Sequence, residues 1–156
     1  MISEESKFLQ STFKALLKDR GFLKHGNTWN KHSELSIAVF NLQRAPWSRA
    51  FYINLGVCFR ALGTVAKPNE AHCHVRCRLD QIVPDRARFH DLLNFEKKLF
   101  PMSRKTELQD LVTQFGIPWL DDVSTYSGAA AYAARLPKRH PFVTQDARVL
   151  LGLAEA

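Results

Sequence analysis

Residues 51–60 alternate strictly, with apolar side chains at the odd numbers, and this two-residue period constrains the fold more than any other feature of the sequence. The apolar positions are Phe51, Ile53, Leu55, Val57 and Phe59. Because successive side chains of a strand point to opposite faces, the period predicts a β-strand with one face in a hydrophobic core. Residues 72–79 alternate in the same way and predict a second strand. Its polar positions are His72, His74, Arg76 and Arg78.

We expect these two strands to form an antiparallel hairpin around a loop at residues 63–71. Keeping both apolar faces in one core pairs even numbers with even numbers, because a slip of one residue would turn a whole strand over. A register centred near residue 66 then predicts three cross-strand pairs: Asn54 with Arg78, Cys58 with His74, and Arg60 with His72. The outer face would present a single polar patch of Tyr52, Asn54, Cys58, Arg60, His72, His74, Arg76 and Arg78.

The segments before this hairpin predict a helix and further strands. Apolar residues recur at helical spacing over residues 8–17, and Gly21 is placed to stop that helix. The dipeptide Gly26-Asn27 predicts a tight hairpin turn. Residues 35–43 predict a strand whose alternation slips between Val39 and Phe40, which either a bulge or cover on both faces would explain.

The last half of the chain predicts helices. One has Phe100 on its buried side and is closed by Pro101, another starts at Asp121 and Asp122, and Thr144 caps the final one. The whole order is that of an α+β fold: an antiparallel sheet of about four strands, with an N-terminal helix and three to four C-terminal helices packed on one face. With 156 residues, we expect a single domain over residues 1–156.

The charge of the chain is strongly basic, with a net charge of +7 and a pI near 9.6. Such a balance favours an anionic partner, whether nucleic acid, an acidic protein surface or anionic lipid. The acidic start of the chain lacks the features of a signal peptide, and no stretch approaches about 18 consecutive apolar residues. We therefore expect a cytoplasmic protein with no membrane segment.

Three cysteines, an odd number in a chain large enough to fold without bridges, favour a reducing compartment and free thiols. Strand geometry predicts His72 and His74 on one face and Cys73 and Cys77 on the other, as small core residues, so these four cannot ligate one ion. A zinc site of Cys58, His72 and His74 is the alternative to ordinary surface histidines.

The familiar catalytic motifs are missing from the sequence, which contains no GxSxG, Walker A, GxGxxG or HExxH pattern. A nucleophile pair of Cys58 and His74 would lack a third group to orient it. We therefore expect a non-enzymatic protein that needs no cofactor.

Residues 44–49 predict a loop, because Pro46 cannot donate a hydrogen bond to a central ladder. The loop carries Trp47 between Arg44 and Arg49. Tryptophan and arginine are the residue types that dominate the centres of protein interfaces, so Trp47 is either a binding anchor or a packed side chain. The sequence leaves both interpretations open.

Several short motifs resemble a bacterial family classed as a domain of unknown function. They are Gly21-Phe22, Gly26-Asn27-Thr28-Trp29, Leu42-Gln43, residues 51–56 and Arg76-Cys77-Arg78-Leu79. The resemblance covers about residues 8–80 and implies no established enzymatic activity. It also implies a hypothesis, because proteins of this type often lie beside toxin genes as proposed immunity proteins.

Together these observations favour a non-enzymatic protein-binding module, an immunity protein that neutralises a toxin domain in bacterial competition. Because the chain is basic, the toxin should present an acidic surface. The expected contact residues are Arg44, Trp47, Arg49, Tyr52, Asn54, Arg60, His72, His74, Arg76 and Arg78. The alternative is a nucleic-acid-binding module, in which Tyr52 stacks on a base and the basic side chains of the sheet face follow the phosphates.

Overall fold

The computed structural model of the protein describes residues 2–63 and 65–153, with one helix before an antiparallel sheet and a run of helices after it. The helices are α1 (Glu4–Asp19), α2 (Arg86–Leu92), α3 (Pro101–Leu111), α4 (Ile117–Val123), α5 (Tyr126–Ala134) and α6 (Gln145–Leu150). The strands are β1 (Leu23–His25), β2 (Thr28–His32), β3 (Ser36–Arg44), β4 (Phe51–Phe59) and β5 (Val75–Arg78). This order confirms the α+β fold that the sequence predicts.

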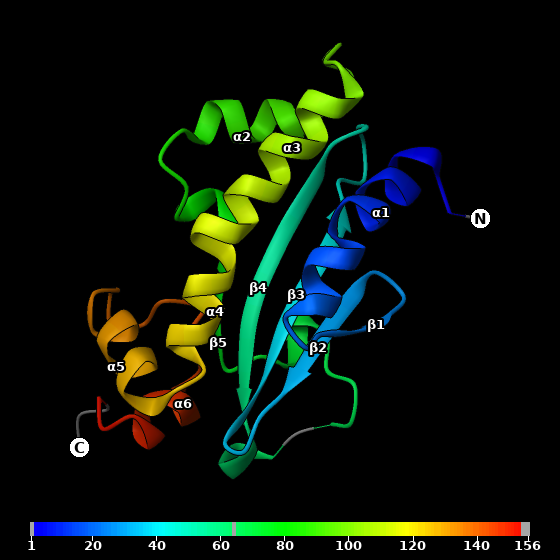
Figure 1. The fold of residues 1–156 in the computed structure, drawn as a ribbon. Coiled ribbons are helices and arrows are strands. Elements are labelled where there is room, and N and C mark those ends of the chain that lie inside the picture. Colours follow the sequence, from blue (N-terminus) through cyan, green and yellow to red (C-terminus); the bar gives the residue numbers. More distant parts are fainter. Residues whose placement is uncertain (1, 64, 154–156) are drawn as a thin grey trace.

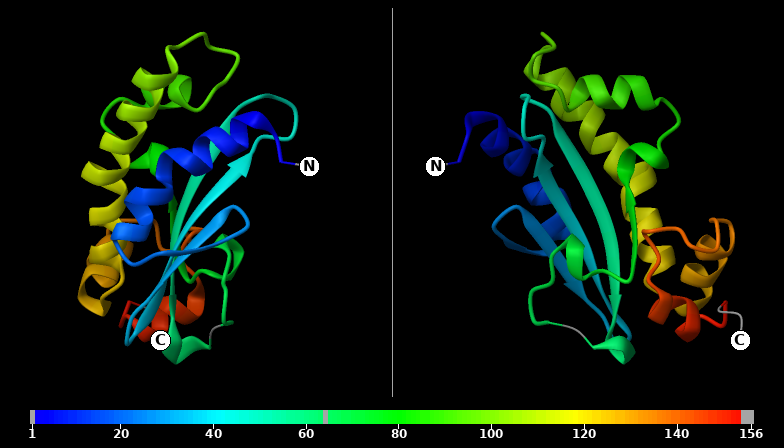
Figure 2. Two further views of the ribbon diagram at one scale, coloured as in Figure 1. Left: turned by 45° about the vertical axis from the view of Figure 1, so that its right-hand side comes forward. Right: turned by 180° about the vertical axis from the view of Figure 1, so that it is seen from behind.

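The five strands follow one another across the sheet in chain order, and every neighbouring pair is antiparallel. The sheet thus has one strand more than the four or so that the sequence predicts. Helices α1, α3 and α4 lie on one face of it, as Figure 1 shows. The opposite face, which we call the back face, is crossed by the connection from β4 to β5 (Figure 2, right).

Helix α1 begins and ends where local chemistry predicts. The Ser3 hydroxyl accepts a hydrogen bond from the amide of Ser6 at 3.1 Å, which caps the helix start. Leu9, Phe13 and Leu17 are fully buried against the sheet. Beyond the last turn, Gly21 has a φ of 87°, a left-handed conformation that favours glycine and confirms the predicted stop.

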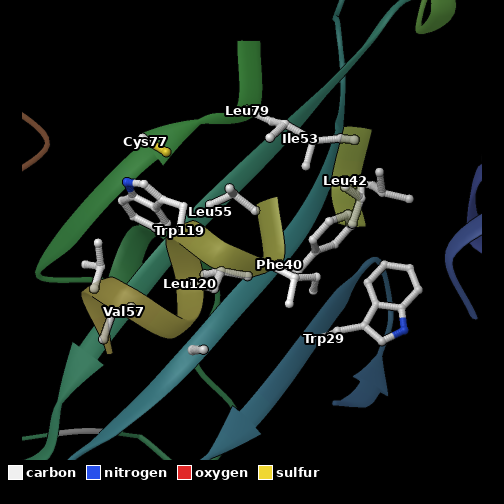
Figure 3. Close-up of a cluster of buried hydrophobic side chains, with 14 of the residues drawn as sticks. Trp29, Phe40, Leu42, Ile53, Leu55, Val57, Cys77, Leu79, Trp119 and Leu120 are labelled. Carbon is white, nitrogen blue, oxygen red and sulfur yellow. The ribbon is translucent and has the colours of Figure 1, made fainter. Parts of the chain in front are cut away.

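A row of apolar side chains crosses the helix-covered face from β2 to β5 and forms the centre of the core (Figure 3). Trp29 pairs with Phe40, Phe40 with Leu55, and Leu55 with Cys77. Leu120 of α4 belongs to the same buried cluster. Burying one side chain of this size is worth roughly 1.5–3 kcal/mol, so this row fixes both the register of the sheet and the position of α4.

A second, smaller cluster lies on the back face and consists of Ile37, Val39, Cys58 and Cys73. We call it the back cluster. The neighbours of Ile37 and Val39 along β3, including Phe40, face the main core, so β3 is buried on both faces. The β3–β4 ladder pairs every position from 36 to 44 without interruption. The slip in the alternation of β3 therefore reflects cover on both faces and not a bulge.

Strand β5 is shorter than the predicted strand at residues 72–79. The predicted register is confirmed where the ladder exists, with Asn54 opposite Arg78. The predicted pair of Arg60 and His72 is wrong, because both residues lie in short 3-10 turns, η1 (Arg60–Leu62) and η2 (Glu70–His72). The ladder has already ended there.

The predicted alternation also fails just before β5. Cys73 lies in the back cluster with Cys58, whereas Cys77 lies in the main core, so the prediction that Cys73 and Cys77 share a face is wrong. The ring of His74 stacks on Phe59, a residue of the main core, with ring centres 6.5 Å apart. The preceding 3-10 turn rotates the chain, and strand periodicity holds only after it.

The segment before α6 pairs with the outer edge of β5. Val143 forms an antiparallel bridge with Val75, and the amide of Arg76 donates to the carbonyl of Phe142 at 2.8 Å. The predicted cap of α6 is confirmed, since the Thr144 hydroxyl accepts a hydrogen bond from the amide of Ala147 at 3.1 Å.

Three predictions for the other helices are wrong. The predicted helix that Pro101 should close is two elements: α2 ends at Leu92, residues 93–100 turn, and Pro101 opens α3 at a position that favours proline. Phe100 precedes this helix and is exposed instead of buried.

Helix α3 then continues into α4 through a π-type turn at Val112–Gly116. This wider turn precedes Pro118, which has no N–H and disfavours an uninterrupted α-helical ladder. Asp121 and Asp122 consequently lie near the end of α4 and do not start a helix. Thr125 caps α5 instead, by accepting a hydrogen bond from the Gly128 amide at 3.1 Å.

Gly56 of β4 generates a test of the back cluster, because a Cβ at this position would collide with the Sγ and Cβ of Cys73. We expect Gly56→Ala to lower the free energy of unfolding by about 1–3 kcal/mol, the usual cost of overpacking. Gly116→Ala is the matched control, since its Cβ would meet Leu79 at an ordinary 3.6 Å. Urea denaturation measures both variants, and an unchanged midpoint for Gly56→Ala would contradict the close approach of Cys73.

Candidate functional site

The loop between β3 and β4 projects its tryptophan into solvent. A hydrogen bond from the Ala45 amide to the Ala50 carbonyl, 2.9 Å long, closes the loop. The Trp47 side chain at its tip is 95% exposed, which excludes the packed interpretation and leaves the binding anchor as a prediction. Trp47 does not pack on its own chain.

The segment between α2 and α3 lies beside this loop at the same end of the molecule (Figures 1 and 2). The Phe95 amide donates to the Arg49 carbonyl at 3.0 Å, and Ala50 forms an isolated bridge with Asn94. Phe100 and Met102, at the start of α3, are 82% and 70% exposed. We call residues 44–50 and 95–102 together the loop end.

Arg104 holds the second half of the loop end in place. Its side chain is buried, and its guanidinium donates to the carbonyls of Leu92 at 2.5 Å and Lys97 at 2.8 Å. The same group lies over the Phe95 ring, 4.4 Å from the ring centre. Desolvation lowers the pKa of Arg104, and the nearby Arg88 adds to this effect. The carbonyls fix the guanidinium, which in turn orders the segment.

A groove of about 430 Å³ opens between α1 and this segment. Its apolar lining includes Phe8, Phe95 and Leu99, and its charged lining holds Arg49, Lys97, Lys98 and Arg104 together with Glu4 and Glu5. Such a groove can accept an apolar side chain from a partner while its rim contacts acidic groups.

An ion pair fixes the side of the groove nearest α1. The Arg49 Nε lies 2.8 Å from a Glu5 carboxylate oxygen. A backbone hydrogen bond and the Arg49 guanidinium lower the pKa of Glu5. This pair ties the β3–β4 loop to the first turn of α1.

Three of the predicted contact residues lie on the back face near the loop end. The guanidinium of Arg78 lies over the ring of Tyr52, 4.3 Å from its centre. The side-chain Nδ2 of Asn54 donates to the side-chain oxygens of Asn41 at 3.0 Å and Gln43 at 2.9 Å. Asn54 is buried in this network, whereas Tyr52 and Arg78 are half-buried and keep an accessible surface.

The remaining predicted arginines are engaged elsewhere. Arg76 is paired with Glu70 at 3.0 Å and covers the Phe142 ring at 4.8 Å. Arg60 donates to the carbonyl of Ser33 at 2.9 Å, in the turn that follows β4. The predicted single polar patch is therefore divided, and only its Tyr52 and Arg78 part adjoins the loop end.

The two predicted histidines use a ring nitrogen to cap backbone amides. His72 Nδ1 accepts from the Asn69 amide at 3.1 Å, and His74 Nδ1 accepts from the Phe59 amide at 2.9 Å. Their side chains do not converge with that of Cys58. Among residues 2–63 and 65–153, no three His, Cys, Asp or Glu side chains are placed to hold a metal ion.

The structure thus defines an α+β protein that exposes Trp47, Phe100 and Met102 at one end of the sheet. Residues 13–122 match the family described as Domain of unknown function (DUF4304), and the chain belongs to this family. The match extends well beyond the residues that carry the sequence motifs and includes the loop end and Arg104. Neither the curated proteins nor the solved structures gave a match. In the described part of the chain, no helix is both long and apolar enough to cross a membrane.

Sequence reasoning missed Lys97, Lys98, Phe100 and Met102 as surface residues of this end. The prediction of one continuous helix up to Pro101 placed Phe100 in the core. The signal that could have corrected it is Pro101 itself, because proline is favoured in the first turn of a helix as well as after its end. Asn94 supports that interpretation, since its side chain accepts from the Glu96 amide at 3.0 Å in a turn.

His74 generates a pH-dependent prediction, because desolvation by burial lowers its pKa, against an opposing effect of Asp146. The unfolded chain then binds a proton at His74 more readily than the folded chain does. This contribution to stability is complete above about pH 6.5 and is lost as the pH falls below it. We expect His74→Asn, which retains an acceptor for the Phe59 amide, to lose less stability than the wild type between pH 7.5 and pH 5. Equal losses in urea titrations at the two pH values would contradict this role.

The histidine contacts also predict that the purified protein binds no stoichiometric zinc. Chelation should leave the melting temperature unchanged. If a structural ion were present, removing it would lower the melting temperature, because such an ion contributes directly to folding. Elemental analysis and thermal denaturation with and without a chelator measure this. About one zinc per chain, lost in His72→Ala or His74→Ala, would restore the metal-site alternative.

Proposed function

We propose that this protein is a non-enzymatic binding module whose loop end docks on an acidic protein surface. The proposed partner is a toxin domain, which the protein would neutralise as a cytoplasmic immunity protein in bacterial competition. Inhibition would be steric and electrostatic and would need no cofactor.

The exposure of Trp47 is the observation that carries this proposal. An indole that is 95% exposed contributes little to the stability of its own chain and becomes useful when a partner buries it. Tryptophan and arginine side chains supply most of the binding energy in many protein interfaces. Trp47 stands between Arg44 and Arg49, with Phe100 and Met102 at the same end.

The charges of the loop end favour an acidic partner. Arg44, Lys97 and Lys98 are exposed along the groove and the shallow hollow beside Trp47, where they outnumber the exposed Glu4 and Glu96, and the whole chain carries a net charge of +7. A complementary acidic surface would speed association and exclude basic partners. Binding should therefore weaken as the salt concentration rises.

The proposed interface continues from the loop end onto the neighbouring part of the back face. Tyr52 is paired with Gln43 at the end of the β3–β4 ladder that leads into the loop. Its ring and the guanidinium of Arg78 form one half-exposed unit. Arg60 and His72 lie beyond the other end of that ladder and are not part of the proposed interface.

The decisive experiment uses the toxin domain that the proposal requires beside this gene. Expression of that domain should arrest growth, and co-expression of the full chain should restore it. Trp47→Ala should weaken the complex by about 2 kcal/mol, or roughly 30-fold in Kd, because a central aromatic anchor is lost. Calorimetric titration measures the affinity, and circular dichroism checks that the variant is folded.

Val149→Ala is the matched control, since Val149 is also largely exposed but lies on α6, away from the loop end. It should bind like the wild type. A chain that gives no protection and binds no toxin domain would refute the proposal. Strong, salt-sensitive binding to generic RNA or DNA in a gel-shift series would favour the nucleic-acid alternative instead, because each neutralised phosphate releases counterions.

A further inference from the structure

Two cysteine thiols meet in the back cluster, although they come from different elements. The Sγ atoms of Cys58, in β4, and Cys73, just before β5, lie 3.8 Å apart. Both side chains are buried, at 1% and 3% exposure. A disulfide has its sulfurs about 2.05 Å apart, so they would have to approach by roughly 1.8 Å.

The surroundings of the two thiols hold them side by side. Cys58 Sγ donates weakly to the carbonyl of His72 at 3.5 Å, and Cys73 Sγ to the carbonyl of Asn69 at 3.6 Å. Gly56 leaves the space that the Cys73 sulfur occupies. Cys73 also lies outside any strand, so its approach to Cys58 breaks no ladder hydrogen bond.

The two thiols differ in acidity, and Cys58 is the more acidic of them. Oxidation in two steps requires one thiol to react with the oxidant first and the other to react with the product. When Cys58 is ionised, the Cys73 thiol can donate to it instead of to the Asn69 carbonyl, and this hydrogen bond lowers the pKa of Cys58 against the opposing effect of burial. The same hydrogen bond, together with burial, raises the pKa of Cys73. Since the thiolate is the nucleophile, Cys58 is the sulfur that reacts first.

The third cysteine is excluded from this chemistry by the sheet. Cys77 lies in the main core, opposite Leu55, and burial raises the pKa of its thiol. It therefore serves as an internal control.

We propose that Cys58 and Cys73 are an oxidative modification site, which closes to an intramolecular disulfide when the protein meets hydrogen peroxide. The Cys58 thiolate attacks one peroxide oxygen, so that an S–O bond forms and the O–O bond breaks, and the departing hydroxide takes a proton and leaves as water. Cys73 then attacks the sulfur of Cys58. The S–S bond forms, the S–O bond breaks, and the second hydroxide leaves as water with the Cys73 proton. Each thiol loses one electron and one proton, and the peroxide is reduced to two waters.

The disulfide would fasten the connection between β4 and β5 to the back face. This connection is held by the hydrogen bond from the Asn30 side chain to the Pro68 carbonyl, 2.9 Å long, and by the Glu70–Arg76 ion pair. A covalent link between residues 58 and 73 limits the freedom of the unfolded chain and stabilises the folded one. Because both sulfurs are buried, peroxide reaches them only when the connection opens, and the reaction should be slow.

The test treats the full native chain with excess hydrogen peroxide, quenches it, and then alkylates the denatured protein. We expect a mass loss of about 2 Da, a Cys58–Cys73 linked peptide, and one alkylated thiol, that of Cys77. The melting temperature of the oxidised protein should rise by roughly 5–10 °C and return on reduction. Cys58→Ser and Cys73→Ser should abolish the mass loss, and Cys77→Ser should retain it.

Three results would overturn the proposal. The first is three alkylated thiols after prolonged oxidation of the wild type. The second is linkage only between chains or through Cys77. The third is a mass gain on Cys58 from sulfinic acid with no linked peptide, which would show that Cys73 does not trap the first product. The wild-type measurements decide all three, whether or not the serine variants fold.

Discussion

The structure depends on the pairing of β3 with β4, an uninterrupted ladder from Ser36 with Phe59 to Arg44 with Phe51. Both strands are buried on two faces over much of their length, so a slip of one residue would exchange the contents of the main core and the back cluster. The β3–β4 loop leaves one end of this ladder, and the connection that carries Cys73 leaves the other. The positions of both proposed sites follow from this one register.

The loop end is ordered by contacts that join distant parts of the sequence. An ion pair links Arg49 of the loop to Glu5 of α1, and a backbone hydrogen bond links Arg49 to Phe95 in the segment before α3. The buried Arg104 side chain donates to a carbonyl of that segment. A preorganised surface loses less conformational entropy on binding than a mobile one does. Trp47 is thus an exposed side chain on a supported loop, which is the arrangement that an interface anchor requires.

Sequence reasoning was most successful where one periodicity governed a whole element. It predicted α1, the strand at residues 51–59 and the register that places Asn54 opposite Arg78, because the apolar side chains that enter the main core fix each of these. It predicted the Gly26 turn from the conformational preferences of the dipeptide Gly26-Asn27. It failed where the period changes over a few residues. The 3-10 turn before β5 moved Cys73 to the back cluster, and the turn before Pro101 brought Phe100 to the surface. The sequence therefore predicted the part of the candidate site in the loop at residues 44–49. It did not predict the part at residues 95–102, because tertiary contacts position that segment and no local pattern encodes them.

The bridge between Val143 and Val75 shows that the C-terminal part of the chain covers the outer edge of β5. The match to the family ends at residue 122, so the residues that pair with the outer edge of β5 lie beyond it. An uncovered edge strand is a template for a strand of another molecule. The segment before α6 covers the outer edge of β5, and a chain that stopped near residue 122 would leave that edge open to pairing with a strand of another molecule.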